Sequence, residues 1–190
     1  MISVLIIDDH PAMRAGVETV LNGTEDLFPV GTGSGEQELW HLVRRARPRV
    51  VLLDYHLPGT NGLVLCHRLK NAVLPPAVVI YSAYADSSLA LAAVAAGADG
   101  ILNKSAPATE LFKAIRTVAS GGKVLPTLTA VAIDEAEAKV DEQDRPILAL
   151  LLDATTLPDV ADAIGIPLDV AAERVQDVIR RLRVEVPTPG

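Results

Sequence analysis

The chain has 190 residues, 49% hydrophobic and 22% charged, so it is long enough to bury one substantial core and a second, smaller one. Its single cysteine excludes an internal disulfide. Neither a cationic, apolar leader nor a run of about eighteen apolar residues is present, so we expect a cytoplasmic protein with no membrane segment. The formal charge is −7, and the excess acid lies in residues 124–190, whose 13 acidic and 6 basic side chains disfavour a broad phosphate-binding surface.

Short apolar runs alternate with segments of helical period along the first two thirds of the chain. The expected strands are residues 4–7, 27–30, 50–53, 77–81 and 100–102, and the expected helices are residues 13–21, 36–46, 63–70, 87–96 and 108–119. This alternation predicts an α/β fold with a five-stranded, parallel, doubly wound sheet of the flavodoxin type. Such a sheet binds its ligands outside the carboxyl ends of the strands.

Polar side chains stand at those strand ends. Asp8 and Asp9 follow the first expected strand, Asp54 follows the third, Ser82 the fourth and Lys104 the fifth. Three carboxylates in one crevice repel one another and need a cation or a proton. Carboxylate oxygens suit Mg²⁺, an aspartate can form an acyl phosphate, and a hydroxyl and an ammonium group can hold phosphoryl oxygens. The pattern therefore predicts a site for Mg²⁺ and a phosphoryl group.

Four motifs, IIDDHP, LLDYHLPGTNG, VVIYSAY and GADGILNKS, resemble in order and spacing the receiver domain of two-component response regulators. The resemblance covers roughly residues 2–121. It implies a regulator rather than an enzyme, which accepts a phosphoryl group from a phosphohistidine of a sensor histidine kinase and slowly dephosphorylates itself. The roles that it implies are Asp54 as phosphoacceptor and metal ligand, Asp9 as direct Mg²⁺ ligand, Asp8 as ligand through water, the backbone carbonyl of His56 as a further ligand, and Ser82 and Lys104 as phosphoryl-binding residues.

The sequence departs from the receiver pattern at three positions. Ile101 stands three residues before Lys104, where many receivers carry an aromatic residue that reorients on phosphorylation, so we expect no aromatic switch there. His56 and Tyr84 stand two residues beyond Asp54 and Ser82. Both are bulky, and in the family these positions flank the path of the attacking water, so we expect them to influence the lifetime of the phosphoryl group.

After residue 122 only helical periods remain. We expect a receiver domain at 1–122, a linker at 123–139 and a small all-α output domain at 140–186, in which residues 158–165 and 168–182 form a helix-turn-helix around Gly165-Ile166-Pro167. The arrangement is similar to the NarL/LuxR class, which implies DNA binding, transcription control and a homodimer on activation. The candidate DNA-binding residues are Arg174, Arg180 and Arg181.

The chemistry of this last helix leaves an alternative open. Ala172 stands where related helices commonly carry a lysine, and Asp169, Glu173 and Asp177 lie on the solvent side of the same helix. A degenerate helical output that binds a protein partner is therefore the second hypothesis. A third, a phosphatase of the haloacid dehalogenase type, needs a second aspartate two residues after the nucleophile, and His56 stands there.

Overall fold

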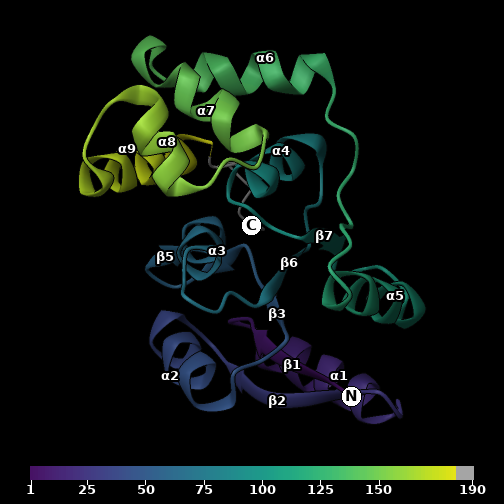
Figure 1. Ribbon diagram of the computed structural model, residues 1–190. Coiled ribbons are helices and arrows are strands. Elements are labelled where there is room, and N and C mark those ends of the chain that lie inside the picture. Colours follow the sequence, from purple (N-terminus) through teal and green to yellow (C-terminus); the bar gives the residue numbers. More distant parts are fainter. Residues whose placement is uncertain (183–190) are drawn as a thin grey trace.

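The computed structural model describes residues 1–182, so residues 183–186, the last four of the expected output domain, lie outside the described part (Figure 1). Its central sheet is parallel, with strand order β2-β1-β3-β6-β7. The strands are β1 (Ile2–Ile7), β2 (Leu27–Gly33), β3 (Val50–Leu53), β6 (Ala77–Ser82) and β7 (Gly100–Asn103). The predicted five-stranded, doubly wound α/β fold is confirmed.

Helices cover both faces of the sheet because the strands are apolar on both sides. On β1, Val4 and Ile6 pack with α1 (Pro11–Asn22) and α5 (Ala108–Ala119). Leu5 and Ile7 face the other way and pack in a larger core. The helices on that second face are α2 (Glu36–Ala46), α3 (Gly62–Lys70) and α4 (Ser87–Ala95). Each expected helix of this part of the chain is present, and each begins within about two residues of its expected start.

Two features of the sheet differ from the expectation. Strand β2 continues through Pro29 to Gly33, which is tolerated because β2 is an edge strand and a bulge shifts its pairing with β1 beside Pro29. A hairpin of β4 (His56–Leu57) and β5 (Thr60–Asn61) follows β3. It was not predicted, because strands of two residues have no measurable period.

The C-terminal part is all-α within the described residues. Its elements are α6 (Ala130–Lys139), a 3₁₀ turn (Glu142–Asp144), α7 (Arg145–Leu152), α8 (Leu157–Ile164) and α9 (Leu168–Arg181). These helices lie beside α3 and α4 (Figure 1), with α6 and α7 against α4, and α9 against α3. The boundaries of the expected linker and output domain stay predictions.

Helix α4 is buried on nearly all sides. Its sequence is apolar around the whole helix, and six of its nine residues are buried. One side packs on the sheet and another is covered by the C-terminal helices, so a single apolar core runs from the sheet into that region. In residues 1–182 no helix combines the length and the apolar character needed to cross a membrane.

Candidate functional site

The strand register places the predicted polar residues near one another at the carboxyl ends of the strands. Ile7 pairs with Leu53, and Leu53 pairs with Ile80 on the next strand. Asp8 and Asp54 are therefore neighbours immediately beyond adjacent strands. Ser82 pairs with Asn103, the residue before Lys104. The structure therefore brings Asp8, Asp54 and Lys104 into contact, and it places Ser82 at the end of the neighbouring strand.

Asp54 is fixed by its own backbone and by the hairpin that follows. Its amide nitrogen donates to the Ile7 carbonyl at 2.8 Å, and its carboxylate accepts from the His56 amide at 3.3 Å. The chain then turns at Pro58-Gly59, where Gly59 has φ 72°, as the third position of a type II turn requires. Gly62 closes the loop against the Asp54 carbonyl so tightly that a Cβ there would lie 2.1 Å from the carbonyl oxygen. The Pro-Gly turn and Gly62 thus hold a buried carboxylate at the strand end.

Lys104 connects the two buried carboxylates. Its Nζ lies 2.8 Å from Asp54 Oδ2 and 2.6 Å from Asp8 Oδ2. Asp8 and Asp54 are 2% and 3% exposed, so the ammonium group compensates charges that solvent does not reach. The Lys104 amide also donates to the Ser82 carbonyl at 2.8 Å, which ties the lysine to the neighbouring strand. Lys104 therefore contacts two of the metal-ligand candidates and is joined through its backbone to Ser82.

Burial dominates the protonation of Asp54. Desolvation raises its pKa, and the hydrogen bond and charge of Lys104 offset only part of that effect, so the pKa stays above its usual value. Burial alone would lower the pKa of Lys104. Its hydrogen bond to Asp54 and its ion pairs with Asp54 and Asp8 outweigh burial and raise that pKa instead. Lys104 is thus stabilised in its charged form, whereas burial destabilises the charged form of Asp54 relative to the protonated form.

The acidic residues form a cluster suited to a divalent cation. One potential ligand atom from each of Asp8, Asp9, His10 and Asp54 lies within 4.8 Å of the others. Asp8 Oδ2 and Asp9 Oδ1 accept no well-directed hydrogen bond from the described residues, although Lys104 Nζ and His10 Nδ1 each lie 2.6 Å from one of them. Buried carboxylate oxygens in this condition fit a hard cation such as Mg²⁺. The residues present therefore fit the predicted ion.

His10 is the one member of this cluster that the sequence prediction did not include. It follows Asp9 directly, and its amide donates to Asp8 Oδ1 at 2.9 Å. A single histidine beside two acidic residues is not a pattern that predicts a metal ligand. The motif IIDDHP contains His10, but the residue stands beyond the two aspartates that follow the strand, so its position relative to the strand end does not indicate a ligand.

The other predicted residues lie around this cluster. Ser82 is buried, and its Oγ accepts from the Tyr84 amide at 3.1 Å. The Tyr84 side chain is 41% exposed, and His56 is also exposed, so solvent reaches both. Ile101 is 8% exposed and belongs to the apolar core. An aliphatic side chain packed in this way gives the position no aromatic group to reorient.

The predicted DNA-binding arginines are not free in this structure. Arg174 donates to Asp144 and to the Gln143 carbonyl, Arg180 pairs with Asp177, and Arg181 pairs with Asp141. Arg180 also lines a cavity of about 580 Å³ between α9 and the β4–β5 hairpin, which includes His56. Each of these cations is thus engaged within its own chain, and α9 shares that cavity with the hairpin that follows Asp54.

Comparison with known proteins gives consistent results. Residues 4–116 match the response regulator receiver domain family. The DNA-binding transcriptional activator DevR/DosR of Mycobacterium tuberculosis is 28% identical over 97% of this chain and 90% of its own length. The nitrate/nitrite response regulator protein NarL of Escherichia coli is 27% identical over 96% and 90%. A crystal structure of a LuxR-family two-component response regulator from Aurantimonas sp. superposes with a TM-score of 0.62 at 26% identity, over 74% of this chain and 99% of the other.

Proposed function

The chain belongs to the response regulator receiver family, and on that premise we propose that it is phosphorylated on Asp54 by a sensor histidine kinase and controls transcription through its C-terminal helices. The observation that carries the phosphoryl half is the placement of Lys104 between Asp8 and Asp54, next to Ser82. A nucleophile and a cation are in contact there, and a hydroxyl-bearing residue stands at the end of the neighbouring strand. Phosphoryl transfer needs a nucleophile and groups that stabilise the negative charge on the phosphoryl oxygens, and these residues supply both.

The chemistry follows from these side chains. A carboxylate oxygen of Asp54 attacks the phosphorus of a phosphohistidine, the P–N bond breaks, and the imidazole leaves as an acyl phosphate forms. Lys104 Nζ and Ser82 Oγ donate to phosphoryl oxygens. Asp8, Asp9, Asp54 and the His56 carbonyl would hold Mg²⁺, which when bound neutralises charge that the transfer brings into the crevice. Because only ionised Asp54 is a nucleophile, the raised pKa of this residue makes phosphorylation slower as the pH falls.

The test of this half is labelling by a small phosphodonor in the presence of Mg²⁺. The wild type should gain one base-labile phosphoryl group, and Asp54→Asn should gain none. Asp26→Asn is the matched control, since Asp26 is an exposed acid paired with Arg116 on another part of the same domain. Labelling of the Asp54→Asn protein at the wild-type level would show that the nucleophile is another residue.

The transcription half is supported by the relatives and by the geometry of the last two helices. Helix α8 ends at Gly165 with φ 69°, and the Ile166 amide donates to the Ala161 carbonyl at 3.1 Å, which gives the tight turn into α9 that a helix-turn-helix needs. Similar chains are named as a DNA-binding activator and as a response regulator, which favours this proposal over the alternative of a protein-binding output.

The structure suggests how the two halves are connected. Helix α9 packs against α3, and its Arg180 faces the hairpin that follows Asp54. We infer that α9 must leave this position before its arginines contact DNA, and that phosphorylation favours its release and homodimerisation. A gel-shift assay with phosphorylated and unphosphorylated protein tests this, together with light scattering for the oligomeric state. If both forms bind DNA equally, phosphorylation does not control the output.

A further inference from the structure

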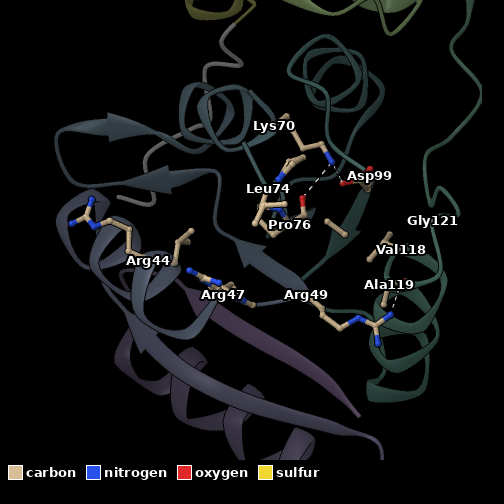
Figure 2. A pocket seen from close by; sticks show the side chains of 14 residues that line it. Arg44, Arg47, Arg49, Lys70, Leu74, Pro76, Asp99, Val118, Ala119 and Gly121 are labelled. Carbon is tan, nitrogen blue, oxygen red and sulfur yellow. Dashed lines mark hydrogen bonds and ion pairs between the residues drawn. The ribbon is translucent and has the colours of Figure 1, made fainter. Parts of the chain in front are cut away.

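A second cavity, here called the basic pocket, opens where the strands of the sheet begin, at the end opposite to Asp54. Its volume is about 870 Å³. The walls come from the C-terminal ends of α2, α3 and α5, from the segment 74–76, and from the starts of β3, β6 and β7. Figure 2 shows this pocket with Arg44, Arg47 and Arg49 spread along one side and Leu74 and Pro76 on the other. None of these residues belongs to the phosphoryl site.

The charge of the basic pocket is strongly positive. Four cations, Arg44, Arg47, Arg49 and Lys70, line it against a single carboxylate, Asp99. Asp99 is already compensated, because Lys70 and Lys123 each place Nζ 2.7 Å from one of its oxygens. In residues 1–182 none of the three arginines has a carboxylate partner, and Arg49 makes one hydrogen bond, to the Ala119 carbonyl at 3.0 Å. The pocket therefore offers uncompensated guanidinium groups to an anion.

Favourable interactions with the carboxyl ends of helices account for two of the three arginines. Arg44 lies in the last turn of α2, where a cation interacts favourably with the exposed carbonyl groups, and Arg49 bonds the end of α5. Arg47 is different. It caps α2 in the left-handed region with φ 44°, a place that glycine usually fills and that costs another residue about 1–2 kcal/mol. A strained backbone that carries a guanidinium group without a protein partner indicates a function for that group.

Size and lining narrow the class of ligand. The volume lies in the range of small-molecule sites, about 300–1,000 Å³. Guanidinium groups bind phosphate oxygens through paired hydrogen bonds, so Arg47, with Arg44 and Arg49 on either side of it, suits a ligand with several linked phosphates. The opposite wall is apolar, and Leu74 is 77% exposed there, so it has surface left to cover an organic group. We propose that the basic pocket binds a nucleoside triphosphate, with its phosphates along the arginines and its base against Leu74 and Pro76.

Calorimetric titration of the full chain with ATP in the presence of EDTA tests this, since EDTA keeps metal-bound nucleotide away from the acidic cluster. We expect saturable binding of one ATP, binding of inorganic triphosphate about tenfold weaker, and none of adenosine. Arg47→Gly should weaken binding by about tenfold or more while leaving the fold at least as stable, because glycine suits the left-handed position. Arg45→Ala is the control, because Arg45 lies on the same helix but does not line the pocket. Asp54→Asn should bind ATP normally, so this site is tested separately from the phosphoryl site.

Four results would overturn the proposal. Absence of saturable ATP binding would remove the site. Equal losses in the Arg45→Ala and Arg47→Gly proteins would reduce it to general attraction of anions. Equal affinity for ATP and inorganic triphosphate would exclude a contact with the base. Displacement of ATP by a short polyglutamate peptide at lower concentration than by ADP would assign the pocket to an acidic polypeptide.

Discussion

Replacement of Lys104 by methionine tests the charge balance of the acidic crevice most directly. Methionine keeps most of the volume and removes the ammonium group that lies 2.6 Å from Asp8 Oδ2 and 2.8 Å from Asp54 Oδ2. At an effective dielectric constant of about 20, each of these attractions amounts to about 6 kcal/mol before desolvation. The two carboxylates that remain lie within 4.8 Å and repel by at least about 3 kcal/mol on the same scale.

The net loss is smaller than the sum of these energies, because the lysine also gives up its hydration when it is buried. Removing one partner of a buried ion pair costs about 3–5 kcal/mol, and we expect a loss of that size in the free energy of unfolding at neutral pH without divalent cations. Lys123→Met is the control. Lys123 is about half exposed, and Asp99 keeps its bond to Lys70, so the loss should stay below about 1 kcal/mol.

Urea unfolding followed by the fluorescence of Trp40, the only tryptophan, measures both variants. Mg²⁺ should stabilise Lys104→Met more than the wild type, since in the variant no ammonium group competes for the carboxylates. The raised pKa of Asp54 gives the sign of the pH effect. Its ionised form costs stability, the cost is present above the raised pKa, and it disappears as the pH falls towards the unfolded value of about 3.9. An unchanged stability of Lys104→Met in EDTA, or an equal loss in Lys123→Met, would refute the reasoning.

Three further predictions concern the loop that follows Asp54, the acidic cluster and helix α9. Gly62→Ala should cost about 3 kcal/mol and slow phosphorylation, because its Cβ would displace the Asp54 carbonyl, whereas Gly16→Ala, with nothing within 4 Å, should stabilise by about 0.5–1 kcal/mol in the same urea titration. Asp9→Ala should weaken Mg²⁺ binding more than Asp8→Ala. The Mg²⁺ affinity of the wild type should decrease as the pH is lowered, because the carboxylates become protonated. Equal effects of the two substitutions in a Mg²⁺ titration would show that the ligands are misassigned. Ala172→Lys should raise DNA affinity on all sequences and steepen the plot of log K against log salt by about one unit, and a variant that binds no better than wild type would show that α9 does not face a duplex.

The sequence was most informative where a single physical rule decides the structure. Parallel strands end on the same side of the sheet, so the sequence alone predicts that Asp8, Asp54, Ser82 and Lys104 lie near one another. The same rule places the strand starts together at the opposite end of the sheet, but it says little about the side chains that the surrounding helices and loops bring there. Arg44, Arg49 and Lys70 come from a helix, a loop and another helix, and only the sheet order assembles them around one pocket.

The pairing of the C-terminal arginines could not be read from the chain either. Arg174 and its partner Asp144 are thirty residues apart, and a helical period shows which side of α9 is polar without showing what lies opposite. Composition gave only the acid excess of this region, which is consistent with each cation having a nearby acid. Whether Arg174, Arg180 and Arg181 contact DNA stays a prediction.

The burial of α4 has a consequence for protein engineering. Response regulators are attractive parts for chimeric sensors, in which a receiver is cut out and joined to a foreign effector. In this chain a cut after residue 122 would remove the helices that cover the outer side of α4 and would leave leucine and alanine side chains in water. A graft that keeps α6 and α7 retains that cover, so the useful junction lies beyond α7 rather than at the end of the sheet.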